Sequence, residues 1–114
     1  MEVGAFDWII TGDLGTFGSR MLRELCQEAG IELGSRHLDC GAMIFSPEQK
    51  YHCGGSGCGC SAVLLAGYVL PALERGEVKR VLFLSTGALM SPLSACQGES
   101  IPGIAHAISL IHQD

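Results

Sequence analysis

The segment from residue 53 to residue 61 constrains this chain most, because it places four glycines and three cysteines in nine residues, directly before an apolar stretch. Glycine carries no Cβ, so a turn this rich in glycine can bring backbone N–H groups against a ligand. A helix that begins at such a turn adds the positive end of its dipole. We therefore take this predicted strand-to-helix turn as the first candidate for a functional site.

Composition limits the class of protein. The 114 residues are 47% hydrophobic, which predicts one domain, residues 1–114, with a packed core. Twelve acidic against seven basic residues give a net charge of −5, which disfavours nucleic acid as a partner. No apolar run reaches the roughly 18 residues that a membrane span needs, and the acidic start lacks the features of a signal peptide. We expect a cytosol-like setting and no direct membrane span.

The six cysteines allow three readings. Three disulfides are disfavoured, because a secretory signal is missing and Cys26 and Cys60 lie in or beside predicted helices. A zinc site would use Cys53, Cys58 and Cys60 with Cys40 or His52, but Cys58 and Cys60 would point in divergent directions as the helix starts. Small, buried, reduced thiols are the favoured interpretation, with no metal site.

The first half of the chain predicts a strand, a helix and a hairpin. Residues 5–10 are rich in β-formers and are followed by a ligand-facing loop. Ser19 is the expected cap of an amphipathic helix that Gly30 closes. Residues 42–45 and 51–53 flank a polar segment with a turn-forming proline, which predicts a hairpin.

The second half predicts a central helix and two strands. Residues 61–73 are apolar on nearly every face, which indicates a helix buried by its neighbours. Pro71 would crowd the carbonyl of Gly67 and kink the last turn. Residues 79–85 and 105–111 are expected to be strands. The alternation of strands and helices predicts an α/β fold.

Five motifs, in order and spacing, resemble the C-terminal part of the stage V sporulation protein AD family over nearly all of the chain. The fold implied is the C-terminal half of a thiolase-like fold, with a mixed β-sheet packed with helices. The resemblance covers about the last third of such a protein, so we expect apolar surface that the N-terminal half, or a second copy in a homo-oligomer, would cover. The motifs are Ile10-Thr11-Gly12-Asp13-Leu14, Asp39-Cys40-Gly41, Gly54-Gly55-Ser56-Gly57-Cys58-Gly59-Cys60-Ser61-Ala62, Thr86-Gly87-Ala88-Leu89-Met90-Ser91-Pro92 and Ile101-Pro102-Gly103-Ile104-Ala105-His106.

The same resemblance implies a role in binding dipicolinic acid while that compound is loaded into the forming spore, beside the other subunits of the transport complex. It also implies a location on the cytoplasmic side of the forespore or spore inner membrane, reached through those subunits. Thiolase enzymes need a nucleophilic cysteine, a histidine before a helix and a second, late cysteine, and the matching places here hold none of these. We expect a non-enzymatic binding protein without a cofactor, unless calcium accompanies the ligand.

Dipicolinate is a flat aromatic dianion, so its carboxylates need fixed donors and its ring needs an apolar slot. Backbone N–H groups and serine hydroxyls of the turn suit one carboxylate. Arg20, Arg36, His37 and His52 are further basic candidates, and Asp13 is a candidate contact for calcium or simply a turn residue. The expected ligand-binding residues are Gly55, Ser56, Gly57, Cys58, Gly59, Cys60, Ser61, Thr86, Gly87 and His106.

Two other functions remain open. One is a degenerate acyl-transfer enzyme of the thiolase superfamily, in which Cys58, activated by the helix N-terminus, would be the nucleophile. The other is a structural module that docks on membrane transport subunits.

Overall fold

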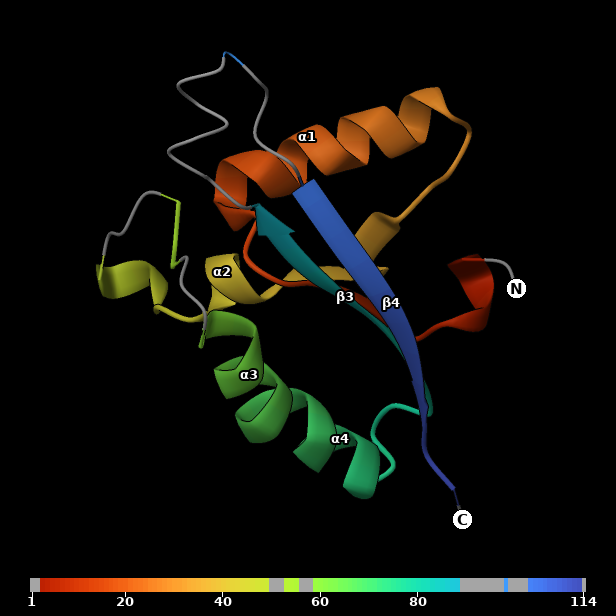
Figure 1. Cartoon of the computed structure of the whole chain (residues 1–114). Coiled ribbons are helices and arrows are strands. Elements are labelled where there is room, and N and C mark those ends of the chain that lie inside the picture. Colours follow the sequence, from red (N-terminus) through yellow and green to blue (C-terminus); the bar gives the residue numbers. More distant parts are fainter. Residues whose placement is uncertain (1–2, 50–52, 56–58, 89–97, 99–102, 114) are drawn as a thin grey trace.

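The computed structural model describes residues 3–49, 53–55, 59–88, 98 and 103–113. Its centre is a four-stranded mixed sheet with the order β2-β1-β3-β4. Strand β1 runs parallel to both β2 and β3, whereas β3 and β4 form an antiparallel pair. The α/β class with a mixed sheet is thus confirmed (Figure 1). The strands are β1 (Trp8–Thr11), β2 (His37–Asp39), β3 (Arg80–Ala88) and β4 (Gly103–Ile111).

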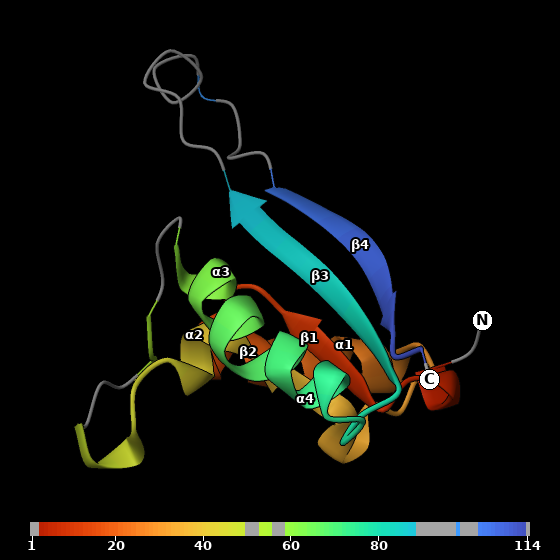
Figure 2. The same ribbon diagram turned by 90° about the horizontal axis from the view of Figure 1, so that it is seen from below.

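Helices cover both faces of this sheet (Figures 1 and 2). Helix α1 (Gly15–Glu28) lies on one face, and a continuous helical stretch from residue 60 to residue 74 lies on the other. That stretch comprises α3 (Cys60–Leu64), the π-helical segment η4 (Leu65–Val69) and α4 (Leu70–Glu74). The short elements are η1 (Val3–Ala5), η2 (Gly34–Arg36), α2 (Cys40–Met43) and η3 (Pro47–Gln49).

The period of two along each strand divides the core between these faces. Ile10, Val81 and Phe83 of the strands are buried in one cluster with Val69 and Leu73 of the 60–74 stretch. Their neighbours in the strands point the other way, so that Ile9 packs with Phe6 and Leu33 in a second cluster that Leu22 and Cys26 of α1 join. The sheet therefore has two apolar sides, as expected for a strand layer between helices.

The start of α1 differs from the prediction that Ser19 caps it. The helix begins at Gly15, four residues earlier, and Leu14 at its N-cap makes no side-chain capping bond. The N–H groups of Leu14 and Gly15 instead donate to the Asp39 carboxylate, at 3.0 and 2.9 Å. A cap supplied from a distant segment leaves no local sequence signal, which is why Ser19 was the wrong choice.

The predicted hairpin at residues 42–53 is also wrong in its first arm. Residues 40–43 form α2, because the Asp39 side chain accepts a hydrogen bond from Ala42 N at 3.0 Å and caps that helix. The polar segment that follows contains the 3-10 turn η3, which begins at Pro47. The second arm, except Cys53, lies outside the described residues.

A π-helical segment directly precedes α4, which contains Pro71, and such segments are among the usual causes of the kind of kink predicted here. Proline has no N–H to donate to the carbonyl four residues earlier, here that of Gly67. The π-helical segment η4 ends just before α4, and Leu70 N donates to Leu65 O, five residues back. A single π turn is a common way to absorb such a gap in the bonding pattern.

The 60–74 stretch is not buried on every face, contrary to the expectation from its composition. Val63, Tyr68 and Leu70 are 58%, 44% and 42% exposed. The sheet covers one side of the stretch, and the described residues place nothing over these side chains. Tyr68 still packs inward with its ring on Trp8, with centroids 5.2 Å apart and planes inclined by 12°.

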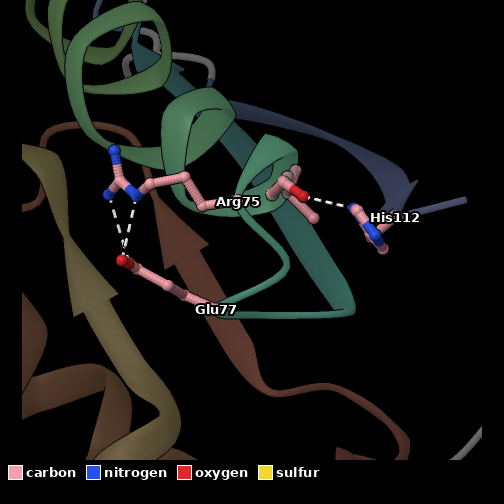
Figure 3. A network of polar contacts seen from close by, with 4 residues as sticks. Arg75, Glu77 and His112 are labelled. Atoms are coloured by element: carbon pink, nitrogen blue, oxygen red, sulfur yellow. Dashed lines mark hydrogen bonds and ion pairs between the residues drawn. The ribbon is translucent and has the colours of Figure 1, made fainter. Parts of the chain in front are cut away.

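The chain after β4 returns to the end of α4. There the His112 ring contacts the carbonyl of Leu73 through Nδ1 (Figure 3). The backbone N–H of His112 also donates to Lys79 O at 2.8 Å. Beside it, Arg75 Nε and Glu77 Oε1 form an exposed ion pair of 2.9 Å. Exposed ion pairs of this kind add little stability. The contact of His112 with Leu73 is therefore the more important interaction between the segment after β4 and the end of α4.

Candidate functional site

The glycine-rich segment is held backbone to backbone against the starts of two helices. Thr16 N donates to Cys53 O at 3.0 Å, and Gly55 N donates to Gly41 O at 2.7 Å. There is no room for side chains at this crossing. A Cβ on Gly54 would lie 1.8 Å from Gly41 O, and one on Gly15 would lie 2.6 Å from Cys53 O. Close approach of backbones therefore explains Gly15, Gly41 and Gly54 directly.

After this crossing of Cys53–Gly55 with Gly41 and Thr16, the chain reaches the first turn of α3, where the ligand site was predicted. Gly59 is the N-cap residue and makes no side-chain capping bond. Cys60 is buried and its Sγ lies 3.7 Å from Gly55 O, while Ser61 is half-buried. The N–H groups of a first helical turn have no acceptor within the helix. Gly55 N–H, in contrast, is already bonded, and Ser56, Gly57 and Cys58 lie outside the described residues.

The other predicted ligand residues lie along the β3–β4 pair. Thr86 and Gly87 are in β3, opposite Ala105 and Ile104 of β4. His106 is exposed and lies opposite Ser85. By its register His106 shares a face of the sheet with Leu110, which packs on the core beneath α3 and α4. The predicted histidine thus lies on the same side of the sheet as the helix start.

Asp39 organises the ends of β1 and β2 and is a residue that the sequence interpretation did not single out. Its two oxygens accept four hydrogen bonds, three from the backbone N–H groups of Leu14, Gly15 and Ala42 and one of 2.5 Å from Thr11 Oγ1. Asp39 is 3% exposed. An Asp at the end of a strand, directly before a Cys-Gly pair, carries the signal of a helix cap, but its role for α1 depends on the tertiary fold.

His37 continues this polar network. Thr11 Oγ1 lies 3.0 Å from His37 Nε2, and Arg23 Nε donates to His37 Nδ1 at 3.3 Å. Since Nδ1 accepts, Nε2 carries the proton and donates to Thr11, whose hydroxyl donates in turn to Asp39. Burial lowers the pKa of His37, and the charge of Arg23 lowers it further. The imidazole is therefore held neutral in one tautomer.

A groove of about 520 Å³ opens between α1 and the segment formed by β2 and α2. Arg20 and Arg23, one turn apart on α1, supply its positive charge. The sequence interpretation had considered Arg20 and His37 as separate basic candidates, and the structure brings them together. Arg36 does not line the groove, and His52 lies outside the described residues. Among the residues that the structure describes, the lining is formed by Thr16, Ser19, Arg20, Arg23, His37, Leu38, Asp39, Ala42 and Met43.

Two of the described thiols, Cys40 and Cys60, are poor nucleophiles. Burial raises the pKa of Cys40 to about 12, and the neighbouring Cys60, Asp39 and Asp13 add to the effect. Burial also raises the pKa of Cys60. Because the thiolate is the reactive form, these two cysteines remain protonated near neutral pH. Cys26, Cys40, Cys53 and Cys60 are all free.

The described ranges contain neither a cluster of metal-binding side chains nor a membrane-spanning helix. Within them no group of three or more His, Cys, Asp or Glu side chains is placed to hold a metal ion. Cys58, which the zinc alternative needed, and His52, one of its two possible fourth ligands, fall outside those ranges. Among the helices that the structure describes, none has both the length and the apolar character to cross a membrane.

Comparisons with known proteins point to one family. The family model described as stage V sporulation protein AD matches residues 1–111. The stage V sporulation protein AD of Bacillus subtilis (strain 168) is 43% identical over 103 residues, which are 90% of this chain. The matched region is 30% of the relative's length, so the chain spans less than a third of the protein that it resembles.

Proposed function

Since the chain belongs to the stage V sporulation protein AD family, and so to a family of sporulation proteins, we propose that it forms part of a dipicolinic acid-binding protein of the spore. The ligand would lie at the first turn of α3. The observation that carries this proposal is the glycine crossing, which fixes the start of a helical stretch of fifteen residues, 60–74, beside the ends of β1 and β2. A rigid helix start with uncommitted N–H groups suits a carboxylate.

The binding role is proposed to be non-catalytic. Protonated thiols at Cys40 and Cys60 support this, because an acyl-transfer enzyme needs an activated nucleophile and a base. Acyl transfer through Cys58 is the alternative. Incubation of the chain with an acyl thioester, followed by mass spectrometry, decides between them. An acylated cysteine would contradict a purely non-catalytic role.

Calorimetric titration with dipicolinate, with and without calcium, tests the proposed site. Ser61→Asp places a negative charge in the first turn of α3, where it should stabilise the helix by about 0.3–1 kcal/mol and repel a dianion. We expect the variant to be at least as stable as the parent chain and to bind dipicolinate at least about tenfold more weakly. Ser46→Asp, on an exposed loop, is the matched control and should bind normally. Equal binding by both variants would place the ligand elsewhere.

Exposed apolar side chains favour a docking role alongside ligand binding. Val63, Tyr68 and Leu70 in the 60–74 stretch, and Ile108 on β4, are 42–58% exposed. Apolar surface of this kind supports packing on an N-terminal half like that of the longer relative, or on a second copy of the chain. We propose that the family's other transport subunits bring the protein to the cytoplasmic side of the spore inner membrane. Light scattering distinguishes a dimer from a monomer, and Tyr68→Glu should abolish a dimer that uses this surface.

A further inference from the structure

The groove between α1 and β2–α2 has no part in the proposed dipicolinate site. Its lining comes from α1, β2 and α2. Helix α1 and the 60–74 stretch lie on opposite faces of the sheet (Figure 2). We propose that this groove is a second binding site, for a small organic monocarboxylate with an apolar body. The inference does not rest on the proposed function, because none of the groove residues belongs to the first turn of α3.

The charge of the groove favours a single negative charge. Arg20 and Arg23 contribute two positive charges, and His37 is held neutral by its hydrogen bonds. Asp39 contributes one negative charge, but its oxygens already accept four hydrogen bonds from Thr11, Leu14, Gly15 and Ala42. The titratable groups lining the groove therefore sum to one net positive charge, which a monocarboxylate would balance.

Donors for such an anion remain available. Arg23 uses Nε and Nη2 to bond the ring and the carbonyl of His37, which fixes its guanidinium and leaves other N–H groups free of a described partner. Arg20 makes no hydrogen bond to any residue that the structure describes, and its guanidinium lies 5.6 Å from the centre of the Phe17 ring. Arg20 and Arg23 both line the groove, and the planar guanidinium of an arginine such as Arg20 can bond both oxygens of a carboxylate.

Ser19 gives independent support. Its Oγ is buried in the groove wall and finds no hydrogen-bond partner among the described residues. Buried hydroxyls are nearly always bonded, and a serine within a helix usually bonds the carbonyl four residues earlier. Since this oxygen has less than 1 Å² of accessible surface, a ligand oxygen in the groove would satisfy it only after the Ser19 side chain rotates toward the groove.

The apolar part of the ligand follows from the rest of the lining. Leu38, Ala42 and Met43 provide carbon surface beside the charged groups. The volume of about 520 Å³ is in the range of small-molecule sites and exceeds what an inorganic ion fills. Methionine adapts to ligands of different shape.

Benzoate is a suitable probe, and benzamide is its neutral counterpart of the same shape. In ¹H–¹⁵N spectra of the full chain, benzoate should produce saturable shifts in the amides of residues 16–23 and 38–43, and benzamide should not. Arg20→Gln should weaken benzoate binding at least about tenfold, whereas Arg36→Gln, outside the groove, should leave it unchanged. No saturable shift at these amides, or equal binding of benzamide, would overturn the proposal. Tighter binding of inorganic phosphate than of benzoate would overturn the ligand class.

Ser19→Ala separates a binding role from a structural one. Alanine is the better helix former and removes a buried unsatisfied hydroxyl, so the variant should unfold at an equal or higher denaturant concentration. It should nevertheless bind benzoate several-fold more weakly. Unchanged binding in Ser19→Ala, together with unchanged binding in Arg20→Gln, would show that benzoate does not use this groove.

Discussion

Gly54 and Gly41 approach each other so closely that a Cβ on Gly54 would lie 1.8 Å from the carbonyl oxygen of Gly41. Gly54 also has a φ of +90°, in the left-handed region. The same carbonyl oxygen accepts a hydrogen bond of 2.7 Å from Gly55 N. Gly41 O therefore both packs against Gly54 and bonds Gly55. The glycines therefore have a steric role, whatever ligand the turn binds.

Gly54→Ala should destabilise the chain by about 3 kcal/mol or more, because overlap with Gly41 adds to the strain of the backbone. Gly30→Ala is the matched control. Gly30 has a similar φ of +81°, but a Cβ there would meet nothing within 4 Å, so we expect a loss of about 1 kcal/mol. Urea unfolding followed by circular dichroism measures both. Equal losses would mean that the crossing relaxes without cost.

Asp39→Asn should lower the free energy of unfolding by about 2–4 kcal/mol. The amide keeps one acceptor oxygen and turns an NH₂ group toward backbone donors, so part of the bonding to Leu14, Gly15 and Ala42 is lost in a buried place. Glu32→Gln removes an exposed negative charge of equal size and should change stability little. A comparable effect of both changes in urea unfolding would mean that net charge, not capping, is responsible.

The lowered pKa of His37 predicts that the chain loses stability in mild acid. Its folded-state pKa is below the ordinary value of 6.5, so the unfolded chain takes up the proton first. The free energy of unfolding should therefore fall as the pH drops below about 6.5, toward the lower pKa of the folded state. His37→Gln keeps a donor near the position of Nε2 but does not titrate, and the difference between the two proteins isolates the histidine. Parallel pH profiles for both would contradict this assignment.

Cysteine reactivity should follow burial. At pH 8, iodoacetamide should label exposed Cys53 well before Cys40, whose pKa is raised to about 12. Peptide mapping by mass spectrometry assigns each label. Addition of urea should make Cys40 and Cys60 as reactive as Cys53, because unfolding removes the burial that raises their pKa. Early labelling of Cys40 in the folded chain would contradict the described core.

Local sequence patterns predicted the central elements well. The strands predicted at residues 5–10 and 79–85 are present at Trp8–Thr11 and Arg80–Ala88, and the predicted helix before Gly30 is present as α1. These predictions used β-propensity and apolar spacing, which depend only on neighbouring residues. The same reasoning misplaced the start of α1 and replaced α2 by a strand. The first error arises because the cap of α1 is Asp39, 24 residues away from Gly15, which no local pattern indicates. The second overlooked a local signal, since Asp39 directly precedes α2 and accepts a hydrogen bond from Ala42 N.

The candidate sites show the same limit. The glycine-rich turn was evident because its composition is local, although the steric need for Gly41 and Gly54 depends on how the two segments cross. The groove was not predicted as a site. Arg20, Arg23 and His37 are ordinary residues in the sequence, and they come together only because β2 pairs with β1 beneath α1.

The hydrogen bonds of Asp39 also couple the motions of the helix starts. If the first turn of α1 opened, the carboxylate would lose two of its donors while it remained buried beside α2. Opening one helix start therefore weakens the other, and Cys53–Gly55, which is bonded to Thr16 and Gly41, opens with them. In hydrogen exchange these three segments should behave as one cooperative unit, so that a single buried charge sets how often this end of the molecule opens.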